Sequence, residues 1–134
     1  MHSGSRFRRV AFIVASVIIL ASLTMIYGCR TPGKYGGPVE DRLPADGTYR
    51  GGSRYGPVRV RADVTIEDGA ISDIEIVKHF YGRGKKAEGP VIERILSTQS
   101  TRVDAVTGAT GSSIAIMNAV EDAVVEATEQ RRQQ

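Results

Sequence analysis

The chain has 134 residues, of which 41% are hydrophobic and 25% charged, enough for one domain with a modest core. Its 18 Lys and Arg residues exceed its 15 Asp and Glu residues by three, and Arg6, Arg8 and Arg9 account for that excess. The rest of the chain is neutral, so its charge gives no basis for nucleic-acid binding, and no nucleic-acid partner is expected.

The first 28 residues are typical of a signal or anchor segment. Basic residues precede a nearly unbroken apolar run from Val10 to Tyr27, and the only cysteine, Cys29, follows it. A lone thiol cannot form an internal disulfide, and "IYGC" resembles a bacterial lipoprotein cleavage box, which implies lipidation of Cys29. The alternative is an uncleaved membrane-spanning helix. With either anchor, the basic start places the domain outside the cytoplasm, in the periplasm or at the cell surface.

Residues 29–45 are rich in Gly and Pro and show no apolar period, which predicts a tether to a domain that spans residues 46–130. The domain opens with a short strand, from Asp46 to Gly56, that glycines interrupt. Residues 58–67 then alternate apolar and polar side chains, which predicts a strand with one buried face.

A hairpin joins this strand to its partner. Asp68-Gly69 is a hairpin turn signal, and residues 70–79 return as the second strand. Ile71 is out of phase with Ile74, which predicts a β-bulge near Ser72.

The solvent face of the hairpin carries charges of both signs. Arg59 and Arg61 are expected to face Asp73 and Glu75 across the two strands. Such pairs stabilise a sheet by a few tenths of a kcal/mol, on the order expected for exposed ion pairs. The charges are therefore interpreted as structural and not as a binding patch.

Two helices complete the domain. An irregular loop over residues 80–89 leads to a short helix from Pro90, and the apolar side of this helix contains Val91, Ile92, Ile95 and Leu96. A last helix is predicted from near Ser112 to about Gln130 by apolar residues at helical spacing, namely Ile114, Met117, Val120, Val124 and Ala127. Met117 is interpreted as a core residue. The order of elements predicts an α+β fold, a single domain with helices packed on a small antiparallel sheet.

Few residues suit standard catalytic or metal chemistry. The part of the chain after the anchor segment has one histidine, His79, and no cysteine beyond Cys29, whereas a zinc site takes several such ligands, so no metal is expected. No serine lies in a GxSxG motif, and no lysine follows the glycines of "GATGSS" as in a phosphate-binding P-loop. Enzymes built on these motifs are therefore excluded.

The stretch "VDAVTGATGSS", Val103 to Ser113, lies before the last helix. It brings four hydroxyl side chains into seven positions: Thr107, Thr110, Ser112 and Ser113. Backbone N–H groups and the dipole at a helix N-terminus favour a phosphate there. The alternative is that Ser112 or Ser113 only caps the helix.

The segment "DAVTGAT" resembles the signature of the FMN-binding domain family, which also occurs in subunits of sodium-pumping quinone reductases and related electron-transfer complexes. The similarity covers nearly all of residues 46–125, from "DGTYRG" through the hairpin to "AIMNAVEDAV". It implies FMN as cofactor, attached to Thr110 through a phosphoester bond. It also implies a separate flavin transferase that takes FMN from FAD and recognises Asp104. The other motif positions that the resemblance assigns to the cofactor site are Thr107, Gly108 and Ala109.

Further residues are expected to complete the cofactor site. The helix that begins near Ser112 offers N–H donors to the phosphate. His79, Phe80 and Tyr81, at the end of the hairpin strand, are expected near the flavin ring, where they can stack or form hydrogen bonds.

The chain is interpreted as a membrane-anchored flavoprotein that carries electrons outside the cytoplasm, rather than as a stand-alone enzyme. Its expected partners are the flavin transferase and a membrane electron donor or an extracytoplasmic redox protein. Two alternatives remain open. The chain is a binding or sensory module that holds FMN without turnover, or it is a structural lipoprotein in which the motif is only a capped turn.

Overall fold

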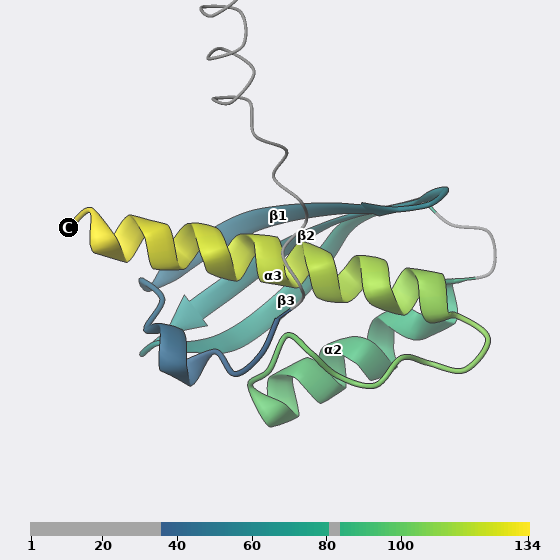
Figure 1. Cartoon of the computed structure of the whole chain (residues 1–134), viewed down its shortest axis with the longest axis horizontal. Coiled ribbons are helices and arrows are strands. Elements are labelled where there is room, and N and C mark those ends of the chain that lie inside the picture. The colour runs from purple at the N-terminus through teal and green to yellow at the C-terminus, as the bar shows by residue number, and fades with distance from the viewer. Residues whose placement is uncertain (1–35, 81–83) are drawn as a thin grey trace, which may run out of the picture. The chain divides into compact units, whose positions relative to one another are not determined.

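The computed structural model describes residues 36–80 and 84–134, which form an antiparallel sheet with helices on one face (Figure 1). This arrangement confirms the predicted α+β class. The strands follow one another in space in the order β1-β2-β3, and they are β1 (Gly47–Tyr55), β2 (Val58–Glu67) and β3 (Ala70–Phe80). The helical elements are η1 (Glu40–Arg42), η2 (Gly84–Ala87), α2 (Glu88–Thr98) and α3 (Thr110–Arg132).

The predicted anchor falls outside this part of the chain. Residues 1–28 and Cys29 are not among the described residues, and neither is Tyr81. Within residues 36–80 and 84–134, no helix combines the length and the apolar character needed to cross a bilayer.

Helix α3 packs across β1 and β2, and α2 lies beside it against β3 (Figure 1). Gly51 of β1 permits this close approach. A Cβ atom built on Gly51 would lie 1.9 Å from the carbonyl oxygen of Ala119 and 2.7 Å from the backbone nitrogen of Ala123. The prediction that glycines interrupt the first strand is therefore wrong. Strand β1 is continuous over 9 residues, and the missing side chain makes room for the helix.

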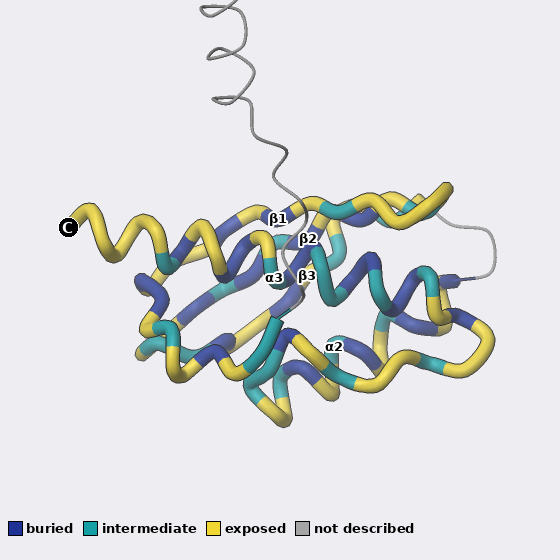
Figure 2. Tube along the Cα trace, viewed as in Figure 1, coloured by how far each residue is buried: buried dark blue, intermediate teal, exposed yellow. Residues whose placement is uncertain are grey.

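The core lies between the helices and the sheet (Figure 2). Alternate residues of β2 supply one side of it, namely Val60, Ala62, Val64 and Ile66. The other side is rich in alanine, with Ala115, Ala119, Ala123 and Ala127 all fully buried on α3. Each buried valine or isoleucine contributes about 1.5–3 kcal/mol. Met117 packs against this core, as predicted, and its sulfur accepts a hydrogen bond from Val103 N at 3.4 Å.

The β-bulge predicted near Ser72 is confirmed. Thr65 pairs with Asp73, but the next residue, Ile66, pairs with Ile71, so Ser72 is the extra residue in β3. The bulge turns the Ile71 side chain into the core, where it is 3% exposed.

A second bulge, at Val77, was not predicted. Arg61 pairs with Lys78, whereas the next residue, Ala62, pairs with Ile76. Because side chains alternate along a strand, the extra residue exchanges the two faces for the rest of β3. His79 consequently points to the helix side and Phe80 to the open side of the sheet.

The predicted charge pairs of the hairpin are wrong, because Asp73 lies opposite Thr65 and Glu75 lies opposite Asp63, nearer the turn. Arg59 lies opposite Phe80 and Arg61 lies opposite Lys78. An ion pair forms instead between β1 and β2, where Arg50 donates two hydrogen bonds of 2.6 Å to the Asp63 carboxylate. The hydrogen bond from Arg50 lowers the pKa of Asp63, and the pKa of Arg50 is raised by the same bond.

Residues 36–45, which were expected to belong to the tether, pack against the domain. Val39 is fully buried, and its backbone N–H donates to the carbonyl oxygen of Gln99 at 2.9 Å. Pro38 forms an isolated β-bridge with Ser100, and the Pro44 side chain is fully buried. The packed part of the chain therefore begins before residue 46.

Two carboxylates on α3 fix this helix to the chain around it. Glu121 accepts hydrogen bonds from Arg42 and from the Thr101 hydroxyl, each at 2.5 Å. Asp122 reaches over the edge of the sheet and accepts a hydrogen bond of 3.0 Å from the backbone N–H of Gly52. These directional hydrogen bonds help to fix the orientation of α3 on the sheet, where the other contacts are mostly apolar.

Candidate functional site

A tight turn leads into α3. The N–H of Ala109 donates to the carbonyl oxygen of Val106 at 2.9 Å, which closes a four-residue turn around Thr107 and Gly108. Gly108 has a φ of 75°, a left-handed conformation that favours glycine at this turn position. Thr107 is exposed at the tip of the turn.

Helix α3 begins at Thr110, two residues before the predicted start. Neither candidate serine caps it, so the capping interpretation is wrong. The Ser113 hydroxyl accepts a bond from Val106 N and donates to the Ala109 carbonyl oxygen, both at 3.0 Å. Ser113 therefore fixes the turn to the helix, and the cap position is held by Ala109, whose side chain makes no capping bond.

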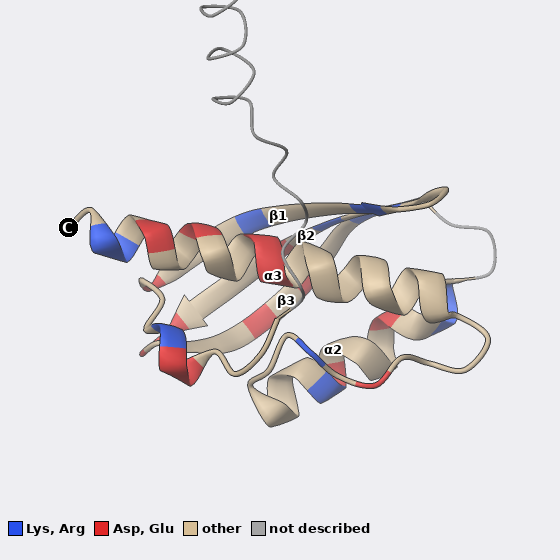
Figure 3. Cartoon of the chain, in the orientation of Figure 1, with Lys and Arg blue, Asp and Glu red and all other residues tan. Residues whose placement is uncertain are grey.

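The start of α3 has the properties of an anion site. Its first bond of the helical pattern joins Ser113 N to the Ala109 carbonyl oxygen at 2.9 Å, which leaves the N–H groups of Thr110, Gly111 and Ser112 without an acceptor within the helix. The first turn carries no acidic side chain (Figure 3). Thr110 is exposed and is the first residue of α3, beside these backbone donors and at the positive end of the helix dipole.

His79 connects three elements beneath this helix start. Its Nδ1 lies 2.6 Å from Oε1 of Glu88 in α2, and its Nε2 lies 3.2 Å from the Ser112 hydroxyl in α3. The His79 side chain is only 3% exposed. The structure thus brings together His79 and Ser112, two residues predicted for the cofactor site. The Val77 bulge makes this contact possible, because it turns His79 toward the helices.

Lys86 is a neighbour of the turn that sequence reasoning missed. A Cβ atom built on Gly108 would lie 2.9 Å from Lys86 Nζ, so the ammonium group lies against the turn. The run "GKKAEG" gave no sign of this contact, since Lys86 is 22 positions away from Gly108 in the sequence. The one unusual feature of this run was its cluster of cations, which did not indicate a contact with the turn.

Other predicted residues lie around the turn or away from it. Asp104 is exposed, and its carbonyl oxygen accepts a bond of 2.5 Å from the Arg94 side chain, which fixes the backbone before the turn. Phe80 is 64% exposed and lies on the opposite face of the sheet from His79. Tyr81 and Cys29 lie outside the described residues, so their predicted roles stay predictions.

These features match a known domain. The family model for the FMN-binding domain matches residues 55–125, which include the hairpin, α2, the turn and most of α3. The comparison with curated proteins found no match. The donors at the start of α3 and the ammonium group of Lys86 suit a phosphate group.

Proposed function

The chain belongs to the FMN-binding domain family and has FMN as its cofactor, and on this premise we propose that it carries electrons outside the cytoplasm with FMN attached covalently to Thr110. The observation that carries the proposal is the position of Thr110, exposed, first in α3 and preceded by a glycine turn. FMN supplies the electron-transfer chemistry when bound, and the chain's own residues hold and orient it.

Three features of the chain support a phosphoester at Thr110. The N–H groups of the first turn of α3 can donate to phosphate oxygens. Lys86 adds a positive charge against Gly108. Ser112 has its hydroxyl engaged by His79, so its contribution to the phosphate is its backbone N–H.

Attachment requires a separate flavin transferase with FAD as the donor. The Thr110 oxygen forms a bond to the FMN phosphorus while the pyrophosphate bond of FAD breaks, AMP leaves, and the hydroxyl proton is lost. The exposed Asp104 side chain is available for recognition by the transferase. Since the Arg94 side chain fixes the backbone at Asp104, the segment that the transferase would recognise is held in place before the transferase binds.

Thr107 is the natural competitor for the flavin, because both threonines are exposed. Thr107 lies at the tip of the turn, whereas Thr110 lies at the helix start, where backbone donors and the helix dipole act on the phosphate. This difference in electrostatic environment favours Thr110.

Intact mass spectrometry of the full-length protein, produced with a flavin transferase, tests the assignment. The wild type and Thr107→Ser are expected to gain the mass of FMN less one water, stable to denaturation, whereas Thr110→Ala is expected to lack the adduct. Asp104→Ala is expected to be modified in part. Flavin that remains on denatured Thr110→Ala would refute the assignment and point to Thr107 or Ser112.

The same spectra report on the anchor that we propose. A lipidated Cys29 at a new N-terminus gives one mass, and an uncleaved segment from Val10 to Tyr27 gives another. Reduction of the flavin in native membranes supplied with NADH then separates an electron carrier from a module that only binds FMN.

A further inference from the structure

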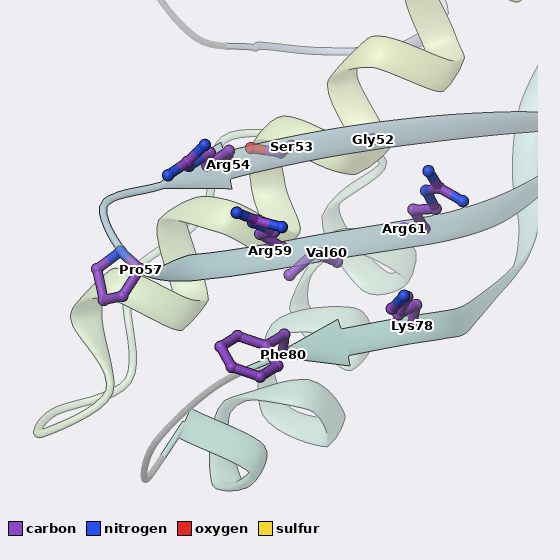
Figure 4. A pocket seen from close by; sticks show the side chains of 9 residues that line it. All are labelled: Gly52, Ser53, Arg54, Pro57, Arg59, Val60, Arg61, Lys78 and Phe80. Carbon is purple, nitrogen blue, oxygen red and sulfur yellow. The ribbon is translucent and has the colours of Figure 1, made fainter.

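The open face of the sheet carries a cluster of cations at one end. Arg54 of β1, Arg59 and Arg61 of β2, and Lys78 of β3 surround a shallow hollow of about 720 Å³ (Figure 4). Phe80 lies beside them and is 64% exposed. We call these five residues the basic face.

The register places like charges directly opposite each other in the basic face. Arg54 faces Arg59, and Arg61 faces Lys78. Like charges opposite each other destabilise a sheet. In the part of the chain that the structure describes, none of these four side chains has an acidic partner, and Arg54 donates only to the carbonyl oxygen of Gly56.

The other end of the same face shows that the sheet can pair its charges. There Arg50 binds Asp63 through two bonds of 2.6 Å and also attracts Glu75. The repulsion in the basic face is therefore a local feature of the sheet. An anionic partner would relieve it.

The basic face and the attachment residue lie at the same end of the sheet. Consecutive residues of β3 serve the two sides: His79 contacts Ser112 in the first turn of α3, and Phe80 lies in the basic face. Gly111, next to Thr110, packs near Tyr55 and Val58 at the turn between β1 and β2. Only the thickness of the sheet would separate a partner bound to the basic face from the start of α3 on the other side.

We propose that Arg54, Arg59, Arg61 and Lys78, with Phe80, form the docking surface for an acidic face of the protein that exchanges electrons with this chain. The inference rests on the proposed function as an electron carrier. A protein partner suits the composition of the face, because arginine and exposed aromatic residues are enriched in protein interfaces. Guanidinium groups also bind carboxylates through paired hydrogen bonds.

Charge reversal gives a test that the fold can tolerate. In Arg59→Glu/Arg61→Glu, each new carboxylate faces a retained cation, Arg54 or Lys78, so the sheet gains two opposite-charge pairs. The matched control is Arg102→Glu/Arg132→Glu, which changes the net charge equally at two exposed positions outside the basic face.

The measurement is the rate of flavin reduction in native membranes that contain the full-length protein and receive NADH. At low ionic strength the reversal variant is expected to be reduced at least about tenfold more slowly than the wild type, and added salt should narrow the difference. The control is expected to behave like the wild type. Equal rates for the reversal variant and the wild type, or equal slowing in the control, would overturn the proposal.

A cross-linking experiment separates docking from flavin attachment. A carbodiimide joins the amine of Lys78 to a carboxylate of the partner without a spacer, and Thr110→Ala is expected to cross-link as well as the wild type although it lacks FMN. Lys78→Arg keeps the charge and should lose the product. Absence of a Lys78-dependent product would overturn the docking surface, even where the flavin is attached.

Evidence that the basic face binds either of two other occupants would also overturn the proposal. A cross-linked product with the mass of two copies of this chain would assign the basic face to self-association. Protection of Lys78 from acetylation only in vesicles that contain phosphatidylglycerol would assign it to an anionic lipid surface.

Discussion

The two faces of the sheet differ in what they demand of the sequence. On the face covered by helices, four residues of β2 are at most 2% exposed and all are apolar, namely Val60, Ala62, Val64 and Ile66. The open face carries exposed charges, some paired, as between Arg50 and Asp63, and some opposed, as between Arg61 and Lys78. The covered face is constrained by volume, whereas the open face can carry charges that serve a partner.

Two pairs of consecutive residues report on this difference directly. Gly51 faces α3 and Gly52 faces solvent, and the same division separates His79 from Phe80. Substitution of both members of a pair compares the two faces at nearly the same position along the strand.

The first pair is expected to give the largest effect. Gly51→Ala introduces a Cβ atom 1.9 Å from the backbone of Ala119, so the helix must move, and we expect a loss of about 3 kcal/mol in the free energy of unfolding. Gly52→Ala meets nothing closer than 3.9 Å and is expected to change this free energy by at most about 1 kcal/mol. Urea unfolding of the full-length protein in detergent, followed by circular dichroism, measures both. Similar midpoints for the two variants would contradict the close approach of α3.

The second pair is expected to give an intermediate effect. His79→Ala leaves the nearly buried Ser112 hydroxyl without its partner and opens a cavity, which should cost about 2 kcal/mol. Phe80→Ala removes an exposed side chain and should cost about 0.5 kcal/mol or less. The same unfolding measurement applies. A larger loss for Phe80→Ala than for His79→Ala would mean that Phe80, and not His79, faces the helices, and would contradict the bulge at Val77.

The smallest effect is expected on the open face, at the Arg50–Asp63 pair. Because Arg50 lowers the pKa of Asp63, the pair stabilises the fold above the ordinary carboxyl pKa of 3.8, and this contribution is lost as the pH falls through the folded value. We expect Arg50→Gln to unfold at slightly less urea than the wild type at neutral pH. The two urea midpoints should converge as the pH falls below 3.8 and through the lower pKa of Asp63 in the folded chain. A difference that persists in acid would show that Arg50 acts through packing and not through charge.

The sequence predicted those features that show in the alternation of apolar residues along a strand or in a short motif. The bulge at Ser72 lies between two buried isoleucines, Ile71 and Ile74, so the break in their alternation is visible in the sequence. The bulge at Val77 turns His79 toward the core, and because His79 is polar, the alternation of apolar residues does not reveal this bulge. The charge pairs predicted for Arg59 and Arg61 were wrong because the alternation of charges does not fix which residues lie opposite each other, and Asp73 and Glu75 pair nearer the turn, with Thr65 and Asp63.

The candidate site shows the same limit. Thr110 and Gly108 belong to one short segment, so a motif could identify them, and the start of a helix near them was expected. Glu88 and Lys86 reach the site from another part of the chain, through contacts that only the fold creates. Residues that act through tertiary contact had no local pattern from which they could be predicted.

The bond between Asp122 and Gly52 has a consequence for the behaviour of many copies of this chain at high concentration. Strand β1 lies at the edge of the sheet, and a row of unpaired backbone groups at an edge invites strands from other molecules, the first step of aggregation. The Asp122 carboxylate occupies the Gly52 N–H, midway along β1, and places a negative charge there. An incoming strand would have to displace that carboxylate, so α3 protects the edge of the sheet while it also carries the proposed attachment residue.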